Sequence, residues 1–144
     1  MIRDPGDIEL NKLVLMIPHA RRMGFRFLEK TGDSLVIEMP YNPELEVLPR
    51  SGLMANGAIT TLLDTALGAA VYDQFDAYRR IVTLDLRVDF FEKPRPFSSV
   101  TVKTRCLKVT EQIVYVQGDA FCSDDSSAIA HGVAVFSYAD MEEG

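Results

Sequence analysis

Asp64 is the residue of this sequence whose surroundings most strongly suggest chemistry. At 3.6 residues per helical turn, Gly57, Thr61 and Gly68 share its side of a predicted helix. A solvated helix face usually carries Lys, Glu or Arg, whereas Gly and Thr let another backbone or a ligand approach closely. A carboxylate desolvated in this way can act as a general base or as a nucleophile toward a carbonyl carbon. The spacing equally allows an ordinary solvent-exposed acid.

The start of the same helix adds a second chemical group. Asn56 lies two turns before Asp64, and its short amide side chain predicts that it is the N-cap. The first amides of a helix have no partner within it, so they can bind a developing oxyanion. The segment therefore offers a carboxylate and oxyanion donors on one element.

Four basic residues are candidates for binding a small anion. Arg79 and Arg80 precede a predicted strand, and Lys93 and Arg95 lie in a turn that contains prolines. For each of them a solvated loop charge is the alternative interpretation. The net charge of −6 disfavours nucleic acid as a partner, because phosphates are repelled at long range.

The two histidines and two cysteines indicate no further catalytic or metal site. His19 follows Pro18, and His131 alternates with Val133 and Val135 in a predicted strand, so structural roles are expected for both. Neither forms a Ser/His/Asp or Cys/His arrangement, and no metal-ligand spacing is present. Cys106 and Cys122 are too far apart for a CxxC motif and are expected to be reduced core residues.

The segment from Asn56 to about Phe75 is the strongest predicted helix. Its apolar residues recur three and four positions apart, in a stripe centred near Leu63 and Ala70. Residues 7–17 carry a shorter pattern of the same kind, which predicts an N-terminal helix ended by Pro18.

Six segments are predicted to be strands. In residues 83–91, Leu84, Leu86, Val88 and Phe90 alternate with Thr83 and three charged residues, so Thr83 is expected on a solvated face. Residues 23–29 and 34–39 form a predicted hairpin, and residues 98–109, 112–123 and 128–139 are expected to be sequential antiparallel neighbours. Residues 40–52 contain three prolines and are predicted to be an irregular connection.

This order predicts one α+β domain over residues 1–144. Helices and strands do not alternate, so the sheet of about six strands is antiparallel, and the long helix must lie across one face of it. Hydrophobic residues make up 47% of the chain, as in an ordinary globular protein. No secretory signal or membrane-spanning run is visible, so a cytoplasmic protein is expected.

The segment from Gly52 to Ala70, GLMANGAITTLLDTALGAA, resembles the helix motif of hotdog-fold acyl-CoA thioesterases of the phenylacetyl-CoA and 4-hydroxybenzoyl-CoA type. In that family a glycine and two further residues precede HGG, and an acid follows seven residues after the last glycine. Gly52, Gly57 and Asp64 occupy these positions. The next segment, TLDLRVDFFEKPRP, is similar to the family's following strand and proline turn, and the likeness spans about residues 23–139.

The resemblance implies a hotdog fold that hydrolyses an acyl-CoA to a free acid and CoA. Asp64 would be the catalytic carboxylate, and the amide of Asn56 or Gly57 would polarise the thioester carbonyl. Thr83 stands where the family often has a Ser or Thr that holds the attacking water. Thr61, on the side of the helix that carries Asp64, is expected to contact the substrate.

The same resemblance implies an assembly and a set of partners. The chain would form a homodimer, or a dimer of dimers, with the acyl group entering between subunits and no cofactor beyond the CoA of the substrate. Arg79, Arg80, Lys93 and Arg95 are expected near the CoA phosphates. Neither nucleic acid nor membrane is expected as a partner.

Two other functions remain as alternatives. The position of the family's histidine is Ala55 here, and that of its first paired glycine is Asn56. A noncatalytic acyl-CoA binding or regulatory protein would keep the groove without the chemistry. A hotdog hydratase or dehydratase ranks lower, because those relatives pair a histidine with an acid and no histidine lies on the long helix or in the loop before it.

Overall fold

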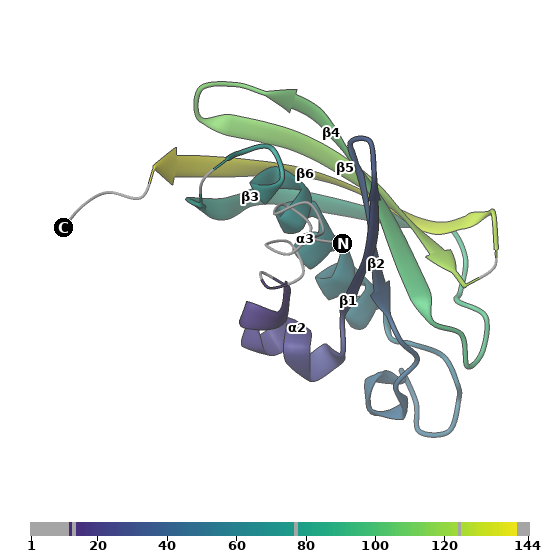
Figure 1. The fold of residues 1–144 in the computed structure, drawn as a ribbon. Helices are drawn as coiled ribbons and strands as arrows, with labels where there is room; N and C mark the ends of the chain where they lie inside the picture. The colour runs from purple at the N-terminus through teal and green to yellow at the C-terminus, as the bar shows by residue number, and fades with distance from the viewer. Residues whose placement is uncertain (1–11, 13, 77, 124, 141–144) are drawn as a thin grey trace.

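The computed structural model describes residues 12, 14–76, 78–123 and 125–140 (Figure 1). Two α-helices, one 3-10 turn and six strands follow the first helical residues, 12 and 14–16, in the described chain. They are α2 (Pro18–Met23), β1 (Arg26–Thr31), β2 (Ser34–Met39), η1 (Pro43–Leu45), α3 (Asn56–Tyr72), β3 (Arg79–Phe90), β4 (Val100–Val109), β5 (Ile113–Cys122) and β6 (Ala128–Asp140). None of the helices in these residues has the length and apolar character needed to span a bilayer.

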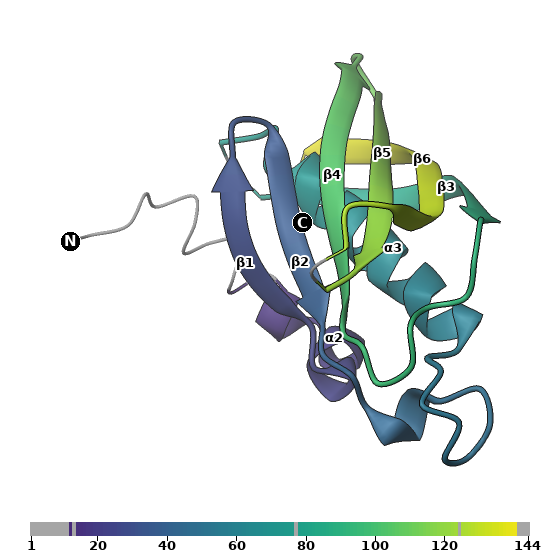
Figure 2. The same ribbon diagram turned by 90° about the vertical axis from the view of Figure 1, so that its right-hand side faces the viewer.

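All six strands belong to one antiparallel sheet in the order β1-β2-β4-β5-β6-β3. The predicted α+β architecture and the sequential pairing of β4, β5 and β6 are confirmed. β3 is the exception to sequence order, because it pairs with β6 at the far edge of the sheet. The sheet curls around α3, so that the helix lies along its concave face (Figure 2).

Helix α3 supplies the centre of the core. Leu63 and Ala70, at the centre of the predicted stripe, are 0% and 1% exposed. The sheet accommodates the helix through Gly118 on β5 and Gly132 on β6, which lie opposite each other. A Cβ on Gly118 would approach Leu67 and Val102 to 3.2 Å, and a Cβ on Gly132 would approach Leu63 to 3.3 Å. The missing side chains therefore let the helix sit directly on the sheet.

The N-terminal region differs from its prediction. Residues 7–11 and 13 lie outside the described residues, and residues 12 and 14–16 are helical up to a bend at Ile17. Pro18 ends this helix as predicted, but it also begins α2, because its fixed φ suits the first helical position. Gly24 ends α2 with a left-handed φ of 78°, so the predicted strand at residues 23–29 instead starts at Arg26.

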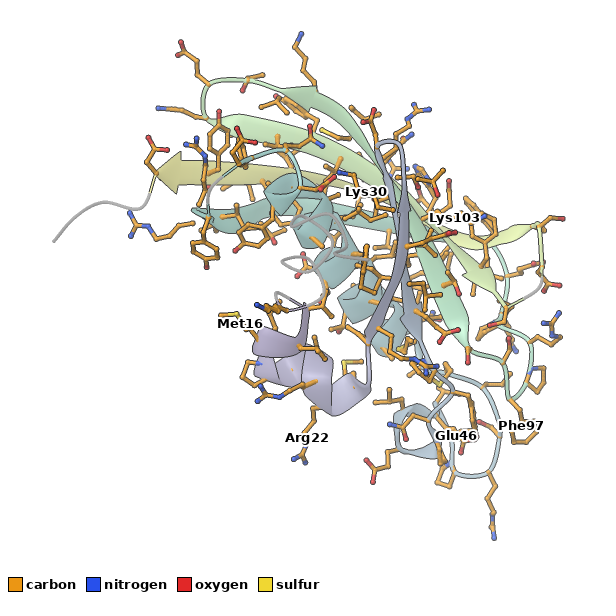
Figure 3. All side chains as sticks on the ribbon, viewed as in Figure 1. Met16, Arg22, Lys30, Glu46, Phe97 and Lys103 are labelled. Atoms are coloured by element: carbon orange, nitrogen blue, oxygen red, sulfur yellow. The ribbon has the colours of Figure 1, made fainter. Side chains whose placement is uncertain are left out.

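The loop between β2 and α3 is organised around one carboxylate. Glu46 accepts hydrogen bonds from the amides of Arg50 (2.8 Å) and Gly52 (2.7 Å) and from the hydroxyl of Tyr41. The loop then returns to its own start, where the Ala55 amide donates to the Leu45 carbonyl at 2.9 Å, just before α3 begins. Figure 3 shows Glu46 in this loop, near Phe97 of the loop that precedes β4. Glu46 therefore helps to set where the start of α3 lies.

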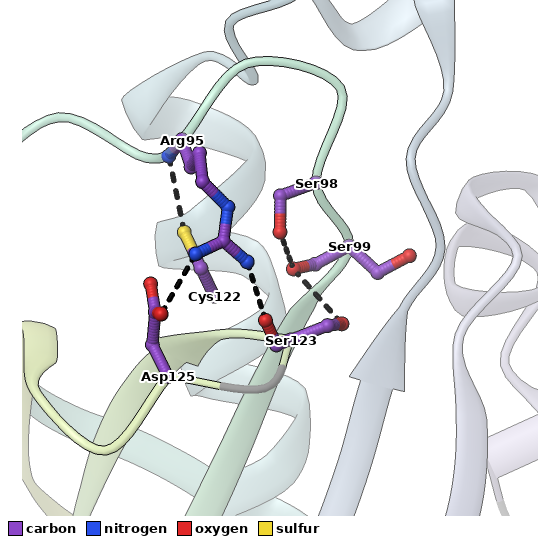
Figure 4. A network of polar contacts seen from close by, with 6 residues as sticks. All are labelled: Arg95, Ser98, Ser99, Cys122, Ser123 and Asp125. Carbon is purple, nitrogen blue, oxygen red and sulfur yellow. Dashed lines mark hydrogen bonds and ion pairs between the residues drawn. The ribbon is translucent and has the colours of Figure 1, made fainter.

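The loop between β3 and β4 is tied to the end of β5. Arg95 pairs with Asp125 at 2.7 Å and donates to the Ser123 carbonyl at 2.5 Å, while its backbone amide approaches the Cys122 sulfur at 3.1 Å (Figure 4). Further along the loop, Phe97 has a φ of 60° and its ring covers Gly52. The two loops at this end of the molecule thus contact each other.

Filling the space under α3 tests this packing. Gly118→Ala is expected to lower the free energy of unfolding by about 1–2 kcal/mol, because the new methyl meets Leu67, Val102 and a backbone carbonyl. Gly57→Ala is the matched control, since a Cβ there meets no atom within 4 Å, and it should raise the free energy of unfolding by up to about 1 kcal/mol. Urea unfolding of both variants measures the difference. Equal effects at the two glycines would contradict the close seating of the helix.

The Glu46 loop predicts a pH-dependent contribution to stability. The hydrogen bond from Tyr41, with those from Gly52 and Arg50, lowers the pKa of Glu46 below its ordinary 4.5, and it raises the pKa of Tyr41 to about 12. Because the folded pKa of Glu46 is depressed, its stabilisation is present above 4.5 and is lost as the pH falls through the lower folded value. Glu46→Gln should therefore lower the urea midpoint near neutral pH, and this difference should shrink in acid. A difference that stays constant over this range would show that the charge of Glu46 is irrelevant.

Candidate active site

A pocket of about 260 Å³ lies beside α3, where the helix, the sheet and the N-terminal segment meet. Its wall on the helix includes Thr61, Asp64, Gly68 and Tyr72. The sheet contributes Ile81 and Thr83 of β3 and Phe136 of β6, and the N-terminal segment contributes Val14, Ile17 and His19. Three of the four residues predicted to share one side of the helix thus line one cavity.

Asp64 and Thr83 meet in this pocket. The Thr83 hydroxyl donates a hydrogen bond of 2.9 Å to Oδ1 of Asp64, which is partly buried. The bond joins two residues 19 positions apart and fixes the orientation of the carboxylate. Its second oxygen makes no hydrogen bond with the described residues, so it can receive a water or a substrate.

Thr83 is exposed to solvent, as predicted, but it does not lie on the predicted face of the strand. The β3–β6 register shifts between Thr83 and Asp85, which makes Leu84 the extra residue of a β-bulge. Alternation along β3 is broken there, so Thr83 joins Ile81 on the side that faces α3. Leu84, which alternation would have buried, is 56% exposed instead.

The start of α3 is open to an incoming group. The N-cap is Ala55 and not Asn56 as predicted, because the extended conformation ends at Ala55 (φ −68°, ψ 145°) and Asn56 is already helical. The amides of Ala58 and Ile59 both donate to the Ala55 carbonyl. Those of Asn56 and Gly57 precede the first bond of the helix, so they point outward. Both residues are exposed, and no atom lies within 4 Å of where a Gly57 Cβ would be.

Thr61 lines the pocket, but its hydroxyl has a local partner. It donates to the Gly57 carbonyl at 2.9 Å, one turn earlier in the helix. The hydroxyl hydrogen of Thr61 is therefore engaged within the helix.

The four predicted anion-binding residues do not line this pocket. Arg79 and Arg80 lie inside β3, not before it, and Lys93 and Arg95 follow its other end. Arg79 pairs with Asp140 and packs on the rings of Phe75 and Tyr138, and Arg95 pairs with Asp125. Arg80 and Lys93 are exposed and form no ion pair with the described residues.

The contribution of the N-terminal segment was missed from the sequence. The tertiary fold brings Val14, Ile17 and His19 to the same pocket as residues of α3, and no local pattern around them indicates this. Tyr72 was missed for a different reason, because a tyrosine at the end of a helix carries no signal of the cavity beside it. In the part of the chain that the structure describes, no group of three His, Cys, Asp or Glu residues could hold a metal ion.

Comparison with known proteins identifies the family. The model of the thioesterase superfamily matches residues 51–129, which is more than half of the chain. A Pseudomonas aeruginosa protein is 27% identical, with a TM-score of 0.83 over 92% of this chain and 98% of its own. No curated protein sequence matches the chain.

Two further solved structures share the fold at lower identity. A thioesterase from Haemophilus influenzae is 17% identical, with a TM-score of 0.82 over 93% of this chain and 90% of its own. The phenylacetic acid degradation protein PaaI from Thermus thermophilus, solved as a mutant, is 15% identical, with a TM-score of 0.71 over 83% of this chain and 97% of its own. The predicted hotdog fold is confirmed by these likenesses and by the family match. The chain therefore belongs to the thioesterase superfamily, whose chemistry is the hydrolysis of thioesters.

Proposed function

We propose that the chain hydrolyses acyl-CoA thioesters to a free acid and CoA, as a homodimer in the cytoplasm and without a cofactor. The observation that carries the proposal is the hydrogen bond between Thr83 and Asp64 inside the pocket. It presents an oriented carboxylate to a cavity whose walls include the apolar side chains of Val14, Ile17, Ala69, Ile81 and Phe136. Such walls suit an acyl chain, and the carboxylate suits the hydrolysis of its thioester.

The chemistry assigned to Asp64 is that of a general base. With Oδ1 occupied by Thr83, the second oxygen takes a proton from a water that attacks the thioester carbonyl carbon. Thr83 keeps the carboxylate in one rotamer during this step. Direct attack by Asp64 on the carbonyl carbon is the alternative, and it would form an acyl-enzyme anhydride.

The oxyanion donors are assigned to the start of α3 in a second copy of the chain. Asp64 lies seven residues beyond Gly57, which corresponds to about 10 Å along the helix. In the reaction, the hydrogen-bond donors must lie about 3 Å from the carbonyl oxygen and the attacking water about 3 Å from the carbonyl carbon. Donors and base on the same helix, about 10 Å apart, are therefore too far from each other to act on one thioester. An antiparallel second copy brings its own Asn56 and Gly57 amides to this Asp64.

The outer edge of β3 supports such an assembly. β3 ends the sheet, so its outer backbone groups have no strand beside them in the described chain. Val82 and Leu84 on it are 59% and 56% exposed. An exposed apolar edge next to the pocket is suited to pairing with the same edge of a second copy. Arg80 and Lys93, at opposite ends of this strand, are the candidates for the CoA phosphates.

Asp64→Asn tests the reaction itself. The variant is expected to lose about 10²–10⁴-fold in kcat, because the base is removed while the side-chain shape is kept. The measurement is release of free CoA thiol from a panel of straight-chain, branched and aromatic acyl-CoAs. Asp76→Asn, at an exposed acid after α3, is the matched control and should match the wild type.

The same panel separates the alternatives. Binding of acyl-CoA without hydrolysis above background, unchanged by Asp64→Asn, would contradict the enzyme and favour a noncatalytic acyl-CoA binding protein. Loss of the double bond of an added enoyl-CoA without release of thiol would favour a hydratase.

Mixing two inactive variants tests the shared site. Asn56→Pro removes one amide at the first helical position, where proline is tolerated after the extended Ala55. If each site combines Asp64 of one copy with Asn56 of the other, refolding Asn56→Pro together with Asp64→Asn at equal amounts should restore about a quarter of wild-type activity. Each variant refolded alone is the control. No recovery, with mixed dimers demonstrated by mass, would mean that each site is built within one chain.

A further inference from the structure

The N-terminal segment brings to the pocket one group that the proposed mechanism does not use. Val14 is 1% exposed, and Ala20 and Met23 of α2 are buried, so this segment packs on the core as part of the fold. His19 lies between these anchors and lines the pocket with Asp64 and Thr83. The family match begins at residue 51, so His19 lies outside it.

The backbone around His19 is held by local bonds. The Arg21 amide donates to the Ile17 carbonyl at 3.0 Å, and the Arg21 guanidinium donates to the Leu15 carbonyl at 3.1 Å. These bonds join α2 to the helical residues before it. The backbone that carries His19 is therefore held beside the pocket by the buried residues of the segment and by these hydrogen bonds.

Among the groups that line the pocket, the histidine is suited to carry a proton near neutral pH. Asp64 accepts a proton from the attacking water in the proposed mechanism. Burial and the nearby Tyr78 raise the pKa of Tyr72 well above its ordinary 10, so its hydroxyl stays protonated. An imidazole can both give and accept a proton near neutrality, which neither of the other groups does as readily.

The ring of His19 is also available for this role. His19 is exposed, lines the pocket and forms no hydrogen bond with the described residues. The second histidine of the chain is different, because His131 pairs with Asp119 at 2.6 Å. Those two residues lie on the sheet face that points away from α3, as the burial of their alternating neighbours shows.

We propose that His19 is the proton donor to the leaving sulfur in the thioester hydrolysis proposed above, on which this inference rests. The water oxygen bonds to the carbonyl carbon while Asp64 takes one of its protons. The C–S bond then breaks, and the sulfur keeps the electron pair and takes a proton from the His19 imidazolium. Asp64 returns its proton to the neutral imidazole. One water and one thioester thus give one carboxylic acid and one thiol.

His19→Gln tests this step in the full chain. Gln keeps a hydrogen-bonding side chain but cannot carry the proton, so kcat should fall about 100-fold, at the low end of general acid catalysis because a thiolate leaves readily. KM should stay within about threefold, since no binding contact to the substrate is assigned to the ring. Arg22→Gln, on the same helix but with its side chain pointing away from the rest of the molecule, is the matched control and should match the wild type (Figure 3).

The pH profile separates proton transfer from a structural role. Because a general acid acts in its protonated form, wild-type kcat/KM should fall on the alkaline side, and His19→Gln should lack this limb. An unchanged profile, a kcat within twofold of wild type, or a change confined to KM would overturn the proposal. An equal urea midpoint for both proteins confirms that the variant is folded.

Histidine NMR gives a readout that needs no turnover. The chain has only two histidines, so His131→Gln identifies the His19 ring signal directly. Titration with a nonhydrolysable thioether analogue of an acyl-CoA should shift the His19 ring signal and leave that of His131 unchanged. A bound analogue that leaves the His19 signal in place would overturn the proposal.

The two proposals fail in different ways. If the wild-type protein hydrolyses no acyl-CoA, both the proposed function and the role of His19 are wrong. If Asp64→Asn loses activity while His19→Gln keeps the wild-type rate, only the role of His19 is wrong.

Discussion

The packing of α3 into the concave face of the sheet is the interaction on which the rest of the molecule depends. Its apolar stripe is fully buried, and Gly118 and Gly132 let Leu67 and Leu63 come down to the sheet backbone. A helix seated this closely cannot rotate without driving side chains into the strands. The side that carries Asp64 must therefore face outward, toward β3 and the N-terminal segment. The position of the Asp64 carboxylate is thus a consequence of the core.

The site then combines elements that have little to do with one another in the chain. α3 supplies the carboxylate, the bulge in β3 turns Thr83 toward it, and the N-terminal segment covers the pocket with Val14, Ile17 and His19. The Glu46 loop controls a different point, where α3 begins and where its open amides lie. Carboxylate and amides are about 10 Å apart on one helix, which is why the proposed mechanism draws on two copies of the chain.

The positions of the basic residues limit how CoA can be held. Arg79 and Arg95 are engaged with Asp140 and Asp125, and Arg95 also ties the loop after β3 to the end of β5. Arg80 and Lys93 lie near opposite ends of a long strand, so they are too far apart to hold one phosphate together. Any recognition of CoA by these residues therefore uses one end of β3 at a time, or different copies of the chain.

The sequence alone was sufficient for the features that depend on periodicity. The α3 stripe, the six strands, the α+β class and the shared helix side of Thr61, Asp64 and Gly68 follow from spacings of 3.6 and 2 residues, because burial of one face imposes those spacings.

Only the tertiary structure decided what depends on contacts between distant segments. The bulge at Leu84 reversed the expected direction of Thr83, β3 paired with β6 at the edge, and His19 reached the pocket through the packing of α2. These three features cannot be predicted from local sequence, because each depends on contacts with residues that are distant in the chain.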